Sequence, residues 1–272
     1  MDLTMEPDKR AVHDFWERAS CGEQLFLRGL ARDDYCDQAR RRYELEPCIE
    51  PFADFAAWAG RRVLEIGVGL GADHQRFALA GARLSGIDLT ERAVAFTRHR
   101  LTLFGLESDL SVGDAERLAF PDAEFDLVYS WGVIHHSPDT ARAVEEIRRV
   151  LRPGGSARVM IYHKWSLVGY MLWARYALAR LKPWMSLTKV YSHYLESPGT
   201  KAYSLREARR MFGRFTNVRA RVVLTHGDLL ESEAGQRHGG SLLTLARRVW
   251  PRTLLRRVAS GQGLFLLIEA VK

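Results

Sequence analysis

Three glycines at alternate positions, directly after a short apolar run, constrain the fold of this chain more than any other feature. The run is Val63-Leu64-Glu65-Ile66, and Gly67, Gly69 and Gly71 follow it. Glycine permits a positive φ and carries no Cβ, so such a loop turns tightly and its backbone approaches a ligand closely. This spacing is compatible with a loop that binds a phosphate and also with a tight turn that binds no ligand. It therefore predicts a buried strand and a glycine loop, without identifying a ligand.

Acidic residues at the ends of successive predicted strands narrow the choice of ligand. Glu65 precedes the first glycine by two residues, where an anion repels a pyrophosphate but helps to orient a cationic amine. Asp88 ends the next strand, and a carboxylate there can accept hydrogen bonds from both ribose hydroxyls. Asp114 follows the third strand, where it can accept from an adenine amine. Each acid alone is also explained as a cap or a solvated turn residue, but the series indicates a nucleoside site.

Strands and helices alternate along the middle of the chain. Strand-like runs cover residues 63–66, 83–88, 125–130 and 157–162, and helices are predicted over 91–104, with Thr90 as N-cap, and over 140–151. A further βα-like stretch covers 205–224, and a last strand covers 263–271. This alternation predicts a parallel sheet covered by helices on both faces, with the ligand at the carboxyl ends of the strands.

Residues 63–162 resemble the core of the class I S-adenosylmethionine-dependent methyltransferases, within the type 11 group that includes the ubiquinone and menaquinone C-methyltransferases. The matching segments are VLEIGVGLGAD, GIDLT, GDAERLAFPDAEFDLVYSWGVIHHSPD and LRPGG. The resemblance implies an α/β fold with a Rossmann-like, mostly parallel seven-stranded sheet flanked by helices, whose last strand, 263–271, is antiparallel. Leu70 departs from the pattern, because many relatives carry a small polar residue there.

The resemblance also implies the cofactor, S-adenosyl-L-methionine, with S-adenosyl-L-homocysteine as product, and it implies the residues that hold it. Those expected on the methionine and ribose side are Glu65, Gly67, Gly69 and Gly71, those expected to bind the ribose are Asp88 and Leu89, and those expected to bind the adenine are Asp114 and Ala115. The floor beneath the sulfonium is expected to consist of Ser130, Trp131 and Gly132. Arg42 and Tyr43 of the N-terminal helices are candidates for contact with the methionine carboxylate, with lid packing as the competing interpretation of the aromatic residue.

Candidate catalytic residues follow two of the predicted strands on the ligand side of the sheet. His135 and His136 come after the fourth strand, and Tyr162 and His163 close the fifth. An imidazole titrates near neutral pH and suits a general base or an acceptor-orienting group. Structural hydrogen bonds at the strand ends are the competing interpretation. No residue is predicted to bind a metal.

Four segments are expected along the chain. Residues 1–60 form an N-terminal helical lid, helical over 11–58 with a break at Pro47, and residues 61–162 form the cofactor-binding core. Residues 163–203 form an insertion at the acceptor pocket. Residues 204–272 complete the sheet and carry a second, basic insertion at 225–262, whose arginines suit an acceptor phosphate or carboxylate, or a solvated helix.

The insertion at 163–203 leaves several interpretations open. Its aromatic and aliphatic stretch WSLVGYMLWARYALARLKPW, residues 165–184, suits a cap over an apolar acceptor pocket, an interfacial helix on a membrane, or a dimer interface or plain core. The stretch is too short and too charged to span a bilayer. A homodimer therefore stays open as well.

Charge is distributed unevenly along the chain. Residues 161–272 contain 19 Lys and Arg against 6 Asp and Glu, whereas residues 1–160 contain 21 against 27. A basic lobe suits an acidic substrate, an anionic membrane or nucleic acid, or is only a solvated surface. Three cysteines without metal-like spacing and an N-terminus without an apolar core indicate a cytoplasmic protein with reduced thiols.

These observations predict a methyltransferase that acts on O, N or C of a small-molecule acceptor, for example a natural product or a lipid-like or anionic metabolite. A non-methylating reaction on the same cofactor, such as cyclisation or aminopropyl transfer, is one alternative. Nucleic-acid methylation is another, although the chain shows no RNA-binding module and no Asn/Asp-Pro-Pro-Tyr/Phe motif. A cofactor-binding regulator with a degenerate acceptor site is a further one.

Overall fold

A seven-stranded sheet forms the centre of the molecule. The computed structural model describes residues 6–231, 247, 248 and 250–272. The strands lie in the order β3-β2-β1-β4-β5-β7-β6, and β7 pairs antiparallel with both β5 and β6 whereas the other pairs are parallel. The expected Rossmann-like sheet with an antiparallel last strand is therefore confirmed. The strands are β1 (Arg62–Ile66), β2 (Arg83–Asp88), β3 (Asp109–Val112), β4 (Phe125–Trp131), β5 (Leu151–Tyr162), β6 (Thr216–Val223) and β7 (Phe265–Val271).

Side chains alternate across the sheet because successive strand residues point to opposite faces. Leu64 and Val128 pack with α7 (Thr140–Val150) and α10 (Leu205–Met211) on one face. Val63 and Leu127 pack with α4 (Ile49–Ala53), the 3-10 helix η1 (Phe55–Trp58) and α5 (Ala72–Leu79) on the other. Both faces of β1 and β4 are therefore buried, which is why their sequences are mostly apolar on both faces rather than alternating.

The termini of α6 (Glu91–Leu103) and α7 lie close to the predicted positions, whereas the start of β5 does not. Thr90 caps α6, because its hydroxyl accepts a hydrogen bond from the Ala93 amide at 3.3 Å. Helix α7 ends at Val150. Strand β5 begins six residues earlier than predicted, since Gly154 and Gly155 pair with Lys272 through backbone hydrogen bonds of 3.0 and 2.9 Å.

The N-terminal region is more interrupted than the predicted helix over 11–58. It consists of α1 (Pro7–Arg18), α2 (Glu23–Phe26) and α3 (Arg32–Leu45), followed by α4 and η1. Gly22 takes a left-handed φ of 74° at the start of α2, and Asp54 takes a φ of 47° between α4 and η1. The breaks at these two residues divide the segments that were predicted to be continuous helix. The predicted break near Pro47 is present, between α3 and α4.

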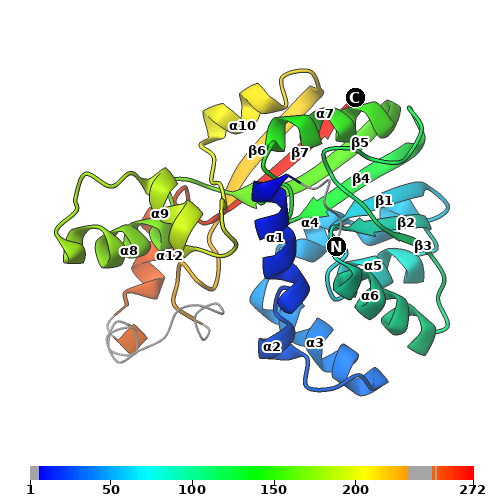
Figure 1. The fold of residues 1–272 in the computed structure, drawn as a ribbon, viewed down its shortest axis with the longest axis horizontal. Coiled ribbons are helices and arrows are strands. Elements are labelled where there is room, and N and C mark those ends of the chain that lie inside the picture. Colours follow the sequence, from blue (N-terminus) through cyan, green and yellow to red (C-terminus); the bar gives the residue numbers. More distant parts are fainter. Residues whose placement is uncertain (1–5, 232–246, 249) are drawn as a thin grey trace.

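A lobe of helices projects beyond the sheet (Figure 1). It contains α8 (Leu167–Tyr176), η2 (Leu178–Arg180), α9 (Leu187–Tyr194) and α12 (Arg252–Val258). Residues 232–246 and 249 of the predicted basic insertion lie outside the described residues. Within the described residues, none of the helices has both the length and the apolar character that a membrane crossing requires.

Candidate functional site

One cavity of about 970 Å³ runs from the glycine loop to the helical lobe. Strand order reverses between β1 and β4, and ligands of open α/β sheets bind in the crevice outside the strand ends at such a point. Near the loop the cavity is lined by residues predicted to hold a cofactor: Arg42, Glu65, Gly67, Gly69, Gly71, Asp88, Leu89, Asp114, Ala115, Trp131 and Gly132. Near the lobe its walls are mostly apolar and include Val168, Met171, Leu172, Ala179, Leu195, Leu264 and Phe265.

The three loop glycines take backbone conformations that other residues rarely adopt. Their φ values are 84°, 54° and 75° for Gly67, Gly69 and Gly71. A Cβ on Gly67 would lie 2.1 Å from a methyl of Val133. The loop therefore needs glycine for conformation and, at Gly67, for space as well.

A buried arginine, Arg100 on α6, fixes this loop to the N-terminal helices. Its guanidinium donates to the carbonyl of Leu70 in the loop at 3.0 Å and to the carbonyl of Tyr35 in α3 at 2.9 Å. It also donates to the side chains of Gln38 and Gln75, both at 2.7 Å. Sequence analysis missed Arg100, because a lone arginine in a predicted amphipathic helix gives no signal of burial.

Asp88 lies at the end of β2, beside the glycine loop. Its carboxylate accepts from the Gly69 amide at 3.2 Å and from the Thr90 amide and hydroxyl at 3.1 and 2.8 Å. Burial raises the pKa of Asp88, and these hydrogen bonds oppose the increase. Asp88, the residue predicted to bind the ribose, therefore lies in the cavity wall and is hydrogen-bonded to the glycine loop.

A buried network surrounds Asp73, which sequence analysis also missed. Asp73 is the second residue of α5, and its carboxylate accepts two hydrogen bonds from Arg42, at 2.8 and 3.1 Å. The hydroxyls of Tyr43 and Tyr129 donate to it at 3.0 and 2.9 Å. Burial alone would raise the pKa of Asp73, but Arg42 and the hydroxyl donors hold it below its ordinary value. Arg42 lines the cavity, whereas Tyr43 is not among the lining residues.

Glu65 is 3% exposed and hydrogen-bonds to a histidine rather than to solvent. Its Oε2 lies 2.8 Å from Nδ1 of His74, whose Nε2 lies 2.8 Å from the Ser108 hydroxyl. Burial, with repulsion from Asp73, raises the pKa of Glu65 well above its usual range, and burial lowers the pKa of His74 to about 3. The predicted role of Glu65 toward an amine stays a prediction.

Asp114, the residue predicted to accept a hydrogen bond from the adenine amine, already has a partner. Lys9 of α1 donates to Asp114 and to Glu116, both at 2.6 Å. Ala115 and Gly113 line the cavity beside it. These contacts attach helix α1 to the end of β3. A bound adenine would either hydrogen-bond to Asp114 beside Lys9 or displace Lys9 from it.

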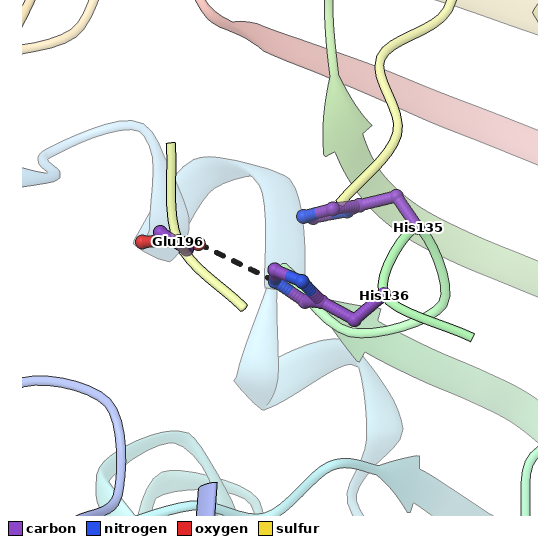
Figure 2. A group of neighbouring side chains, drawn as sticks. All are labelled: His135, His136 and Glu196. Atoms are coloured by element: carbon purple, nitrogen blue, oxygen red, sulfur yellow. Dashed lines mark ion pairs between the residues drawn. The ribbon is translucent and has the colours of Figure 1, made fainter. Parts of the chain in front are cut away.

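His135, His136 and Glu196 come together where the cofactor end meets the lobe (Figure 2). The histidines follow β4, and Glu196 follows α9. Nε2 of His136 lies 3.4 Å from Oε2 of Glu196, which also accepts from the Tyr162 hydroxyl at 2.7 Å. Sequence analysis missed Glu196, because 60 residues separate it from His136 and no motif marks it.

The predicted catalytic residues differ in their access to the cavity. His136 and Tyr162 line it, together with Glu196, whereas His135 and His163 do not. His135 is fully buried, and its burial, with positive charge near it, lowers its pKa well below the ordinary value. His163 is 4% exposed, and its Nδ1 lies 3.2 Å from the Gly263 carbonyl. Ser130, predicted for the cofactor floor, is also buried away from the cavity.

The site has the features that an adenosyl cofactor requires. The left-handed glycines leave a cradle, with no Cβ atoms between the backbone and the cavity. A carboxylate ends β2 on the cavity wall, and a second follows β3. The remaining volume, walled by the lobe, leaves room for a second molecule beside the first.

Comparisons with known proteins agree with this geometry. Residues 64–159 match the family described as "Methyltransferase domain". A ubiquinone biosynthesis O-methyltransferase from Aromatoleum aromaticum is 41% identical over 124 residues, 45% of this chain and 53% of the relative. The 27-O-demethylrifamycin SV methyltransferase of Amycolatopsis mediterranei is 36% identical over 100 residues, 36% of this chain and 37% of the relative.

A solved structure shares the fold over nearly the whole chain. Phosphoethanolamine N-methyltransferase 2 from Haemonchus contortus, in complex with phosphomonomethylethanolamine and S-adenosylhomocysteine, superposes with a TM-score of 0.61 and 18% identity. The match covers 96% of this chain and 60% of that one. The alignment with the Aromatoleum relative spans about half of that protein's length.

Proposed function

We propose that this chain, whose residues 64–159 form a class I S-adenosylmethionine-dependent methyltransferase domain of the type 11 group, transfers a methyl group to a small-molecule acceptor. The cofactor is S-adenosylmethionine. The observation that carries the proposal is the continuous cavity, which joins the glycine loop and Asp88 to an apolar chamber under the lobe. Named relatives that methylate small molecules support methyl transfer over cyclisation, aminopropyl transfer and nucleic-acid methylation.

The cofactor supplies an activated methyl group on a sulfonium. The chain's own contribution is to hold the two reactants in line and to exclude water. Asp88 and Leu89 bind the ribose in this proposal, Asp114 and Ala115 bind the adenine, and the loop glycines with Arg42 receive the methionine end. Trp131 and Gly132 form the floor between the two ends of the cavity.

We assign the acceptor's nucleophilic atom to the surface made by His136, Tyr162 and Glu196. These three side chains line the cavity and hydrogen-bond or pair with one another. A carboxylate and an imidazole at that point can orient an acceptor hydroxyl or amine and withdraw its proton. His135 supports His136 from behind, with their ring centroids 4.2 Å apart. His163 has no contact with the cavity, so we give it a structural role at the end of β5.

The acceptor is apolar over much of its surface in this proposal, because Val168, Met171, Leu172, Leu264 and Phe265 form the chamber wall. The same lobe exposes large apolar side chains, with Leu181 82% and Trp184 79% exposed. Residues 165–195 contain no Asp or Glu but include Arg180, Lys182 and Lys189. We therefore infer that residues 165–184 contact an anionic membrane surface and that an apolar acceptor enters from there.

The first experiment is calorimetry of the purified chain with S-adenosylmethionine and S-adenosylhomocysteine, after any co-purified ligand has been removed. Micromolar binding of both is the expected result. A screen of phenolic, amine and lipid-like acceptors then follows, with S-adenosylhomocysteine and methylthioadenosine measured as products. Failure of ligand-free, folded protein to bind either compound would refute the cofactor assignment. Methylthioadenosine as the product would refute methyl transfer.

A further inference from the structure

Three potential metal ligands converge at the acceptor end of the cavity. His135 and His136 come from the turn after β4, and Glu196 comes from the segment after α9 (Figure 2). One ligand atom of each lies within 4.8 Å of the other two. The segments are joined by a hydrogen bond of 3.0 Å from the Lys201 amide to the His135 carbonyl. The convergence is therefore built into the fold and does not depend on flexible surface side chains.

The separation of two of these atoms already suits a bound ion. Ligand bonds to zinc are about 2.0–2.2 Å for imidazole nitrogen and carboxylate oxygen, so neighbouring donors of a tetrahedral site lie about 3.4 Å apart. Nε2 of His136 and Oε2 of Glu196 are separated by 3.4 Å. A ring nitrogen of His135, the third ligand, lies within 4.8 Å of both atoms.

His135 provides a second, independent indication of a ligand. Its side chain is fully buried, and neither ring nitrogen has a hydrogen-bond partner in the described part of the chain. The ring is held between His136 and Tyr162, with ring centroids 4.2 and 4.0 Å away. Buried polar atoms nearly always have a partner. An unpaired ring nitrogen beside two other potential metal ligands therefore indicates a binding partner that the described residues of the protein do not supply.

The surroundings of the cluster orient its members as they do in metal sites. Nδ1 of His136 lies 2.8 Å from the Ser197 hydroxyl and 3.1 Å from the Thr200 hydroxyl, which donates its own proton to the Ser197 carbonyl at 2.7 Å. Both hydroxyls can accept a hydrogen bond from a protonated Nδ1, and in that tautomer the lone pair of Nε2 faces the Glu196 carboxylate. These two electron-rich atoms repel unless a cation lies between them. Tyr162 fixes Glu196 from the other side, and ligating histidines and carboxylates usually have such partners.

We propose that His135, His136 and Glu196 bind a divalent transition-metal ion at the acceptor end of the cavity. Two imidazoles and one carboxylate favour zinc, manganese, iron or cobalt over magnesium and calcium, which prefer oxygen ligands. Three protein ligands leave coordination positions open, as in catalytic metal sites. Since His136 and Glu196 line the cavity, those positions face the acceptor. The role of the ion rests on the proposed function: it binds the oxygen or nitrogen that receives the methyl group.

The test uses the full chain without a polyhistidine tag, stripped of metal by a chelator. Titration with zinc chloride by calorimetry, and with cobalt chloride by visible absorption, is expected to give one site of micromolar affinity. Glu196→Gln removes a ligand from a half-exposed position and is expected to weaken binding at least about tenfold, as is His135→Asn. His99→Gln changes an exposed histidine on α6 and is expected to retain full affinity.

Binding of S-adenosylhomocysteine, measured on the same samples, separates this proposal from the proposed function. Protein that binds S-adenosylhomocysteine but neither metal refutes the metal site and leaves the cofactor site intact; Nε2–H of His136 then donates to Glu196. Unchanged metal affinity in Glu196→Gln also refutes the site. Metal binding without S-adenosylhomocysteine binding would refute the cofactor assignment alone. If His135→Asn does not fold, Glu196→Gln still decides the question.

Discussion

Single residues of the glycine loop act through backbone conformation and space rather than through side-chain chemistry. Gly67 donates its amide to the Ile87 carbonyl at 2.7 Å, which places the turn against the end of β2. Asp88, the next residue of β2, binds the Gly69 amide and so faces the same ligand. The loop and the carboxylate therefore form one cradle, although 19 residues separate Gly69 from Asp88.

Replacement of Gly67 by alanine is expected to damage the cofactor site more than backbone strain alone explains. The left-handed conformation costs a residue with a Cβ about 1–2 kcal/mol, and the new methyl would also meet Val133. Gly60→Ala is the matched control, because Gly60 has a φ of 72° but no atom within 4 Å of the added Cβ. Calorimetry with S-adenosylhomocysteine should show unchanged affinity for Gly60→Ala and at least tenfold weaker binding for Gly67→Ala. Equal affinities would contradict the steric argument.

Asp88→Ala is expected to weaken cofactor binding by about 1.5–3 kcal/mol, the contribution of hydrogen bonds to a charged group, which is roughly 10- to 100-fold. Asp109→Ala, at the exposed start of β3, provides the control on the neighbouring strand. Both variants should be compared by S-adenosylhomocysteine calorimetry and by thermal unfolding. An Asp88→Ala protein with unchanged affinity would remove the ribose role from this residue.

Helix α10 shows how a single element is fixed by its own first turn. The Ser204 hydroxyl accepts from the Glu207 amide at 3.2 Å, and the Glu207 carboxylate accepts from the Ser204 amide at 2.7 Å. Lys164, after β5, adds an ion pair to Glu207 at 2.8 Å. Burial alone would raise the pKa of Glu207, but these partners lower it to about 2. The capping box thus orients the helix and connects it to the end of a central strand.

The contribution of Glu207 to stability is expected to depend on pH. Because its pKa is lowered on folding, the stabilisation is present above the unfolded pKa, about 4.5, and disappears as the pH falls toward 2. Glu207→Gln should reduce the free energy of unfolding at pH 7 by about 0.5–1 kcal/mol, since the side chain is half exposed. Urea unfolding at pH 7 and at pH 3 measures the difference in the free energy of unfolding between Glu207→Gln and the unchanged chain at each pH. The control Glu44→Gln, in an exposed pair of 3.6 Å, should change little, and a pH-independent deficit in Glu207→Gln would refute the mechanism.

At the scale of the whole molecule, the helical lobe completes the cavity that the sheet only begins. Helix α8 supplies Val168, Met171 and Leu172 to the chamber, while its continuation through η2 exposes Leu178, Leu181 and Trp184. One continuous segment therefore has a face toward the acceptor and a face toward the outside. This arrangement connects the proposed reaction to the surface from which, in our proposal, an apolar acceptor enters.

Loss of the exposed apolar side chains is expected to reduce association with anionic vesicles. The double variant Leu181→Ser, Trp184→Ala should sediment with vesicles of phosphatidylcholine and phosphatidylglycerol severalfold less than the unchanged chain, because both side chains would insert at the interface. Leu79→Ser is the control, since Leu79 is 59% exposed on α5, away from the lobe. Vesicles of phosphatidylcholine alone test the role of the basic residues. If all three proteins sediment equally, the membrane proposal fails.

The core of the fold could be predicted because its signals are local. The order of strands and helices from residue 62 to residue 162 and the Thr90 cap were confirmed, since each depends on a short pattern of apolar, glycine and capping residues. The antiparallel β7, which the family resemblance implied, was confirmed as well. The N-terminal helices were predicted less well. Their breaks at Gly22 and Asp54 depend on how the chain packs around the sheet, which a window of sequence does not contain.

The sequence by itself indicated the resemblance of residues 63–162 to methyltransferase cores, the cofactor and the loop proposed to receive it, because the loop glycines and the acids at strand ends form short local patterns. Only the tertiary structure decided which side chains meet at the acceptor end. Glu196 reaches His136 through the packing of α9 beside the sheet, and Arg100 and Asp73 gain their roles by burial. Contacts between residues far apart in the chain depend on the sheet order and on desolvation, and neither is encoded in a local motif.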